Sequence, residues 1–403
     1  MTTNANSKLV EAWKKYYLGI DAARQAMEAT PRFRDNPDHR AQMYYSLAEA
    51  QAMAYNFAIA PKVDQPWFHT HSWFSYFYTL GGTCPDFYYG TLFLDGKRSY
   101  RITGRFGDLK LILMQVFSHL LGHPESKMLM NADFSTFKKN ADGSFEAIIS
   151  ATRQEGNWIP LDPQSDYNFI FVRRAIADWH GDRGELKISL IDGPIDYDEL
   201  DQEKMASRLE TAAHFLKFLV DKWNIGIYDM YLEKNSGKKN VVVVAPGDSI
   251  ASDYAGSPTT NYVWGVYEIA DDEALIIESD VPEAGYWSMQ LFDVFCKPFD
   301  FVNRQSDVNM SRAVIDGDGR YRCVIALKDP GVANWLDPSG RKEGTIVGRT
   351  YHAKSMLRTP EIKVVKAADL RKHLPADTTY LTPAERQRAL AYRRDGYMKL
   401  YGD

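Results

Sequence analysis

An internal duplication constrains the fold of this chain more than any other feature of its sequence. Two stretches, Asp142–Arg173 and Asp316–Arg349, each run from Asp-Gly through Asn-Trp and Asp-Pro to a final Arg. Matched landmarks keep a nearly constant interval: Asp142 and Asp318 (318 − 142 = 176), Asn157 and Asn334 (334 − 157 = 177), Arg173 and Arg349 (349 − 173 = 176), Gln115 and Gln290 (290 − 115 = 175), and Gly90 and Gly265 (265 − 90 = 175). A repeat of this length is a whole subdomain, not a solenoid unit. We infer a tandem duplication over roughly residues 86–180 and 261–352; the alternative is two β-subdomains that share common turn sequences.

The strand patterns within the two copies predict an antiparallel β-structure. Leu109–Phe117 is almost entirely apolar, which is typical of a strand buried on both faces. Tyr321–Lys328 alternates apolar and polar positions, and Asn140–Gly143 forms an Asp-Gly hairpin turn. Short strands separated by turns favour a sandwich or barrel. The predicted class is α+β, mainly β, with two tandem duplicated antiparallel β-sandwich or barrel-like repeats joined by a central helix and flanked by helical terminal segments.

Helical patterns divide the rest of the chain. Apolar stripes at helical spacing predict helices near residues 7–29, 38–60 and 199–223. Thr382 and Glu385 form a capping box at the start of a last helix, whose basic face we expect to pack on its own chain; the alternative is a partner subunit in a homodimer. The predicted parts are a helical N-terminal segment with an aromatic strand (residues 1–85), repeat A (86–194), a central helix and linker (195–260), repeat B (261–362) and a helical tail (363–403).

Composition excludes several classes of partner. A net charge of −5 argues against nucleic acid as a partner. No apolar run is long enough for a membrane span, and the N-terminus lacks a signal-peptide pattern. Three cysteines in 403 residues fit a reducing compartment, so we expect a cytoplasmic protein. Aromatic residues make up 13% of the chain, which fits either an aromatic-lined pocket or β-rich cores.

The matched arginines and tryptophans are candidate substrate-binding residues. Arg173 and Arg349 occupy equivalent positions, and two guanidinium groups in one cleft would suit a carboxylate, sulfate or phosphate. Alternatively, each pairs with a turn carboxylate such as Asp162 or Asp337 and holds its own loop. Trp158 and Trp335 are matched in the same way, and each would otherwise close the end of its own sandwich.

A second set of residues has the chemistry for acid–base catalysis. Asp178 and His180 lie two positions apart, near Arg173, and such a pair can transfer protons when burial tunes the pKa values. Tyr286 is the third candidate catalytic residue, and Trp287 and Gln290 would add to a polar, aromatic substrate pocket. The alternative is that these residues are structural.

A metal site is a third possibility. His69 and His71 share one face of an aromatic strand, Trp67–Tyr78, and a His-x-His pair can supply two metal ligands. His119, His123 and Asp86 are candidates for further ligands. The alternative is that these histidines are structural or lie at an interface, and we otherwise expect no cofactor.

Five stretches resemble a known family: EGNWIPL, VRRAIADW, YWSMQLFDVF, VNMSRAVIDGDGRYR and DPGVANWLD. Together they are similar to the family catalogued as domain of unknown function 1214, often joined to a domain of unknown function 1254. The resemblance covers about residues 86–352. Cys84-Pro85-Asp86 departs from the Asn-Pro-Asp pattern of that family. The resemblance implies a β-rich fold and no particular reaction.

Two classes of function remain open from the sequence. The first is a cofactor-independent lyase or hydrolase acting on a small organic anion or amphipathic metabolite in a cleft between the repeats. The second is a non-catalytic carbohydrate- or lipid-binding protein, and a metal-dependent cupin-like enzyme using His69 and His71 is a further alternative. The absence of a phosphate loop, a dinucleotide fingerprint and a nucleophile elbow argues against kinases, dehydrogenases and α/β-hydrolases.

Overall fold

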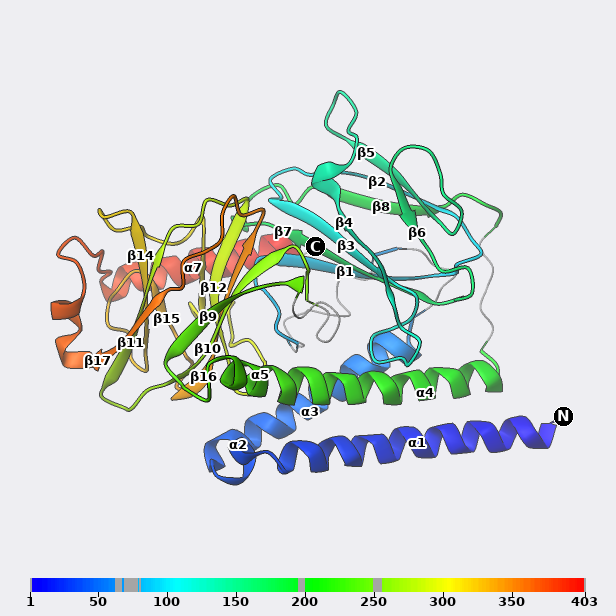
Figure 1. Cartoon of the computed structure of the whole chain (residues 1–403), viewed down its shortest axis with the longest axis horizontal. Helices are drawn as coiled ribbons and strands as arrows, with labels where there is room; N and C mark the ends of the chain where they lie inside the picture. Colours follow the sequence, from blue (N-terminus) through cyan, green and yellow to red (C-terminus); the bar gives the residue numbers. More distant parts are fainter. Residues whose placement is uncertain are drawn as a thin grey trace. The chain divides into compact units, whose positions relative to one another are not determined.

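The computed structural model of the chain describes residues 2–61, 67–68, 79, 81–194, 200–248 and 256–401 (Figure 1). The chain forms two compact units. Unit 1 comprises residues 1–81, 87–175 and 182–225. Unit 2 comprises residues 82–86, 176–181 and 226–403. Repeat A therefore falls largely in unit 1 and repeat B in unit 2.

Unit 1 combines N-terminal helices, a β-sandwich and a long helix. Its helical elements are α1 (Thr2–Glu28), α2 (Pro31–Arg34), η1 (Pro37–His39), α3 (Arg40–Ala54), the π-helix η2 (Tyr55–Ile59), α4 (Gln202–Phe218) and the π-helix η4 (Leu219–Gly226). Its strands are β1 (Phe87–Leu94), β2 (Tyr100–Arg105), β3 (Leu111–Phe117), β4 (Met128–Asp133), β5 (Phe145–Ser150), β6 (Trp158–Pro160), β7 (Asn168–Ala175) and β8 (Glu185–Leu190), with η3 (Phe134–Thr136) after β4.

The strands of unit 1 form two sheets, in the orders β1-β7-β3-β4 and β6-β5-β2-β8. Every residue of β3 is buried, as the apolar run Leu109–Phe117 predicted, and so is every residue of β7. Helices cover one face of the first sheet: the ring of Phe57 on η2 lies 6.1 Å from Phe169 on β7 and 5.4 Å from Phe215 on α4. Along α4, α1 packs side by side through Ala12, Ala206 and Leu209 (Figure 1).

Unit 2 is a second sandwich. Its strands are β9 (Val241–Pro246), β10 (Thr260–Glu268), β11 (Glu273–Asp280), β12 (Tyr286–Phe292), β13 (Asp307–Asn309), β14 (Arg320–Ala326), β15 (Trp335–Leu336), β16 (Glu343–Tyr351) and β17 (Glu361–Lys366). Its helices are α5 (Ile227–Lys234), η5 (Ala367–His373) and α7 (Pro383–Tyr401). The sheets have the orders β13-β12-β16-β10-β9 and β15-β14-β11-β17. A buried core that includes Leu291, Ile325 and Ile346 lies between them.

The two units repeat the same topology, with β9 as an added edge strand in unit 2. The order β1-β7-β3-β4 corresponds to β10-β16-β12-β13, and β6-β5-β2-β8 corresponds to β15-β14-β11-β17. The register agrees as well. Leu113 pairs with Arg173 in unit 1, and the residues 175 and 176 positions later, Ser288 and Arg349, pair in unit 2. The duplicated β-sandwich predicted from the sequence is confirmed.

The repeated asparagine has the same structural role in both copies. The Asn157 side chain donates to the backbone carbonyl of Lys138 and accepts from its backbone N–H, each over 2.9 Å. Asn334 does the same to Val314, at 2.7 and 2.8 Å. Lys138 and Val314 are themselves 176 positions apart. Each asparagine thus holds the loop that precedes its own hairpin.

The C-terminal tail differs in part from the prediction. Its start is a strand, because β17 pairs with β11 and completes the second sheet of unit 2. The capping box is present: Thr382 Oγ1 accepts from the Glu385 N–H, and the Glu385 carboxylate accepts from the Thr382 N–H. Arg386 of α7 is buried and donates to Asp329 and to the Val332 carbonyl, so the helix packs on its own chain. Within the described residues, no helix is both long and apolar enough to cross a bilayer.

Candidate functional site

The matched arginines each bind a matched glutamine in their own unit. Arg173 donates to Gln115 in unit 1 and lies over the Phe171 ring at 4.2 Å. In unit 2, Arg349 donates to Gln290 over 3.0 Å and to the Gly82 carbonyl over 2.5 Å. Both guanidinium groups are more than nine-tenths buried. Asp162 and Asp337, the turn aspartates considered as alternative partners, do not form these bonds. Both copies of the duplicated sequence therefore keep an Arg–Gln pair on their central sheet.

The matched tryptophans also make equivalent contacts inside their own repeats. Trp158 Nε1 donates to Ser150 Oγ over 3.2 Å, and Trp335 Nε1 donates to the Ala326 carbonyl over 2.9 Å. The two acceptor residues are 176 positions apart. Each indole therefore links the short strand that carries it, β6 or β15, to the end of the parallel neighbouring strand, β5 or β14. This geometry fits the structural alternative for both residues.

Asp178 and His180 lie close together in unit 2. The Asp178 carboxylate is 3.5 Å from His180 Nδ1, and Asp395 of α7 is 3.2 Å from Nε2. One face of the imidazole stacks on Tyr392 with a centroid distance of 3.9 Å. Both carboxylates are more than half exposed. The imidazole of His180 therefore lies between two carboxylates, one from the loop that carries it and one from α7.

Tyr286 points into a different, buried environment. Its hydroxyl donates to Asp86 over 2.6 Å and lies 3.2 Å from Cys84 Sγ. Burial and the Asp86 charge raise the pKa of Tyr286 well above its usual value of 10, so the hydroxyl stays protonated. Burial also raises the pKa of the Cys84 thiol to about 11, which makes it a poor nucleophile.

Asp86 is the centre of a fully buried polar network that the sequence did not reveal. Its two carboxylate oxygens accept hydrogen bonds from four side chains of unit 2, at 2.6–2.9 Å: Tyr286, Asn309, Trp179 and Arg312. Because each oxygen has two donors, the carboxylate has no lone pair directed at a ligand. We interpret Asp86 as a structural anchor of the segments 82–86 and 176–181 in unit 2, not as a catalytic base or metal ligand.

A second carboxylate extends the network. Asp307 accepts from Arg312 over 2.5 Å and from Arg393 of α7. Both guanidinium groups lie over the Trp179 ring, at 4.7 and 4.6 Å. Buried charges are tolerated when they are paired and hydrogen-bonded in this way. The two carboxylates and two guanidinium groups of this network are therefore paired with one another inside unit 2.

A pocket of about 290 Å³ opens at one end of the unit 2 sandwich. Its inner wall is apolar and aromatic: Val263, Trp287, Met289, Tyr321 and Leu357. Its rim is polar or exposed: Asp280, Glu283, Ser355, Met356 and Arg358. Trp287 stacks on Tyr321 with a centroid distance of 4.6 Å, so this predicted residue does line a pocket. Arg349 also borders the pocket. Its guanidinium, however, binds Gln290. Since Trp287 and Gln290 are three positions apart on β12, their side chains point to opposite faces of the strand.

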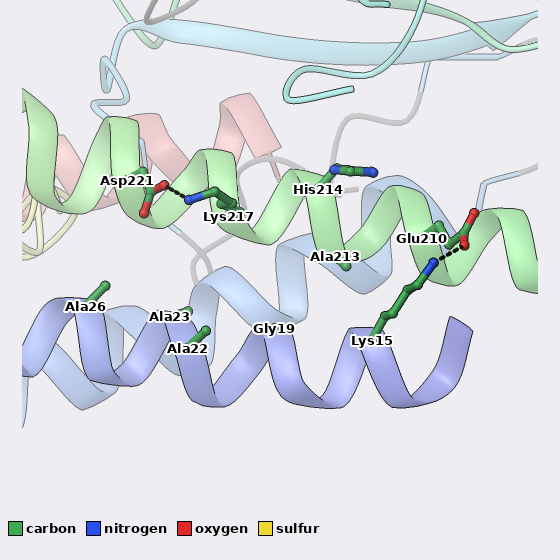
Figure 2. A pocket seen from close by; sticks show the side chains of 10 residues that line it. All are labelled: Lys15, Gly19, Ala22, Ala23, Ala26, Glu210, Ala213, His214, Lys217 and Asp221. Atoms are coloured by element: carbon green, nitrogen blue, oxygen red, sulfur yellow. Dashed lines mark hydrogen bonds and ion pairs between the residues drawn. The ribbon is translucent and has the colours of Figure 1, made fainter. Parts of the chain in front are cut away.

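A larger groove of about 550 Å³ lies between α1 and α4 in unit 1 (Figure 2). Small side chains line its floor: Gly19, Ala22, Ala23, Ala26 and Ala213. Lys15 and Glu210 form an ion pair of 3.1 Å at one end, and Lys217 pairs with Asp221 at the other. None of the residues predicted as a site lies here. The small residues let the two helices approach each other.

Three possible metal ligands lie close together in the loop between β3 and β4. Across the described ranges, His119, His123 and Glu125 form the one group of three such residues whose ligand atoms lie within 4.8 Å of one another. His69 and His71 lie outside the described residues. The spacing of four between His119 and His123 was visible in the sequence, but the contribution of Glu125 was not predicted.

Comparison with known proteins supports the fold and leaves the activity open. Residues 92–176, within repeat A, match the family described as "Protein of unknown function (DUF1214)", which confirms the resemblance inferred from the motifs. A crystal structure of an uncharacterised protein from Burkholderia cenocepacia is similar to 90% of this chain and 99% of its own, with a TM-score of 0.79 and 25% identity. The VPA0106 protein from Vibrio parahaemolyticus aligns over 80% of this chain and 97% of its own, with 13% identity and a TM-score of 0.45. No curated protein matches the sequence.

Proposed function

We propose that the protein binds a small amphipathic molecule in the pocket at the end of the unit 2 sandwich. The observation that supports this proposal is the combination of a buried aromatic wall with a charged rim. Small-molecule sites are concave and mostly apolar, with a few polar groups that fix the orientation of the ligand. The stacked Trp287 and Tyr321 supply the apolar wall, and Arg358, Asp280 and Glu283 supply the polar groups.

The chemistry of the rim favours a ligand with one polar end. Arg358 lies 3.2 Å from Asp280, and Lys354 lies 3.4 Å from Glu283, so both rim carboxylates are paired with cations at the surface. These side chains are largely exposed, and exposed ion pairs contribute little to stability. A ligand carboxylate or hydroxyl can therefore replace a partner of Arg358 at small cost. The volume of about 290 Å³ suits a molecule smaller than a typical drug.

Ligand-dependent unfolding of the full chain tests this proposal. We would add short and medium-chain carboxylic acids, aromatic carboxylates and monosaccharides, and follow thermal unfolding and Trp fluorescence. A ligand at a hundredfold excess over its Kd should stabilise the protein by about 2.7 kcal/mol. Ser355→Trp should fill the mouth and abolish the effect, whereas Thr359→Trp, an exposed neighbour that does not line the pocket, should preserve it. A panel with no stabilising member, or equal binding by Ser355→Trp, would refute the proposal.

A cofactor-independent lyase or hydrolase is the second candidate, and the proximity of Asp178 to His180 favours it. The imidazole would act as the general acid–base group, and Asp178 would orient it. In this proposal His180→Gln lowers turnover of a substrate by about 100-fold or more, while the melting temperature stays near that of the wild type. The matched control is His373→Ala, an exposed histidine in η5. Product formation that is unaffected by His180→Gln would remove this residue from the mechanism.

A further inference from the structure

We infer that the β3–β4 loop and α4 of unit 1 form a binding site for a divalent transition-metal ion, with His119, His123 and Glu125 as ligands. Nitrogen and carboxylate oxygen donors in this combination suit Zn²⁺ and its neighbours in the first transition row. The site uses two of the further ligands predicted from the sequence, His119 and His123, together with Glu125, and needs neither His69 nor His71. It is also separate from the pocket of unit 2.

The geometry of the loop brings the three side chains together. The imidazole rings of His119 and His123 are stacked, with centroids 4.4 Å apart and planes 8° apart. Their ligand atoms and those of Glu125 lie within 4.8 Å of one another. Zinc–ligand bonds of about 2.0–2.2 Å place two ligands of one ion up to roughly 4 Å apart. Small rotations of the side chains are therefore enough to close the site.

Hydrogen bonds already orient His119 for metal binding. Ser118 Oγ donates its one hydrogen to the Glu125 carbonyl over 3.1 Å, and it accepts from the Lys127 N–H over 3.0 Å. The 3.1 Å contact between Ser118 Oγ and His119 Nδ1 must therefore use a hydrogen on Nδ1. In the neutral ring this leaves a lone pair on Nε2. Such a hydrogen bond to the second ring nitrogen is typical of metal-bound histidine.

His123 is oriented by the same loop. Its Nδ1 accepts a hydrogen bond of 3.2 Å from the Glu125 N–H, so this nitrogen also carries a lone pair. A metal ion would take this lone pair in place of the Glu125 N–H.

A third imidazole lies beside the site because the loop packs closely on α4. The His214 ring centroid is 6.2 Å from that of His123. Figure 2 shows the His214 side chain leaving α4 on the side away from α1, whereas Ala213 points toward α1. At Gly122, with φ of +82°, an added Cβ would lie 2.7 Å from Phe218 Cβ on α4. Only glycine permits this approach, which brings the His214 ring beside the site.

Zinc binding by the full chain tests the inference. After removal of metals with a chelator, the wild type should bind one Zn²⁺ in competition with a chromophoric chelator, and Co²⁺ should give the visible bands of tetrahedral nitrogen and oxygen ligation. The double variant His119→Ala/His123→Ala should lose more than about 100-fold in affinity. Ser118→Ala removes the orienting bond to His119 together with the bonds to Glu125 and Lys127 inside the loop, and should lose about 10- to 100-fold. His373→Ala, an exposed histidine in unit 2, is the matched control and should bind as the wild type does.

Three results would overturn the inference: no tight Zn²⁺ binding by the wild type, equal affinity in the double variant, or a loss of affinity confined to His69→Ala/His71→Ala. Thermal unfolding without metal separates ligand loss from misfolding. If the double variant does not fold, the single variants His119→Gln and His123→Gln decide the question by the same measurement. Binding in the pocket of unit 2 uses other residues, so either proposal can fail without the other.

Discussion

Asp293 should make the protein less stable as the pH rises, and replacing it with Asn should remove this effect. The residue follows β12 and is 3% exposed. Its Oδ1 accepts from the Phe295 and Lys297 N–H groups at 2.8 and 2.9 Å, while Oδ2 is buried with no hydrogen-bond partner among the described residues. Burial raises its pKa from 3.8 to about 6, against the attraction of Lys297 and Arg341.

The sign and size of the effect follow from linkage. Between its unfolded pKa of 3.8 and its folded pKa of about 6, the folded state binds more protons than the unfolded state, so stability falls as the pH rises. A difference of about 2 pKa units, at 1.36 kcal/mol each, corresponds to about 3 kcal/mol once the pH exceeds the folded value. Asn keeps the Oδ1 acceptor and removes the charge. The free energy of unfolding of Asp293→Asn, relative to wild type, should therefore rise by roughly 2–3 kcal/mol between about pH 4 and about pH 8.

Urea unfolding at several pH values measures this difference directly. The comparison with wild type at each pH cancels the contributions of the other titrating groups. Asp271→Asn, which removes a carboxylate that is 79% exposed, serves as the control for a generic Asp-to-Asn change. If the relative stability of Asp293→Asn stays constant from acid to neutral pH, the buried carboxylate does not carry the effect and the reasoning is wrong.

Three further predictions concern stability. Asp86→Ala should cost about 3–5 kcal/mol in urea unfolding, because Arg312 loses a buried partner; a cost below about 1 kcal/mol would contradict the structural role of the network. For Asp318, hydrogen bonding to Arg322 lowers the pKa to about 2, so this carboxylate stabilises the fold above its usual pKa of 3.8 and the stabilisation is lost as the pH falls toward 2. Asp318→Asn should therefore lower the melting temperature at neutral pH, with a gap that narrows in acid; a constant gap would exclude the charge as its cause. Gly122→Ala should cost about 1–3 kcal/mol more than Gly143→Ala, since both have positive φ but only Gly122 has close neighbours; equal costs would show that the loop does not press on α4.

Features that depend on local patterns could be predicted from the amino-acid sequence. Turn residues and alternating apolar positions set where strands begin and end, and the capping box at Thr382 set the start of α7. The duplication was visible because matched residues make the same contacts in each copy. Asn157 and Asn334 hold equivalent loops, and the matched tryptophans and arginines make equivalent contacts. Repetition in the sequence therefore marked residues that each sandwich needs for its own fold.

Contacts between side chains that are distant in the sequence depend on the tertiary structure. Arg349 binds Gln290 because β12 and β16 are neighbours in the sheet, and strand order depends on the whole chain. The carboxylate of Asp86 meets Asn309 and Arg312 more than 200 positions later in the sequence, so no local pattern could reveal the network. The pocket of unit 2 is lined by residues of the strands β10, β11, β12, β14 and β16 and of two loops. The proposed metal site is formed by a loop that packs against α4. Local periodicity encodes the hydrogen-bonded elements, whereas sites form where the register and packing of these elements bring separate segments together.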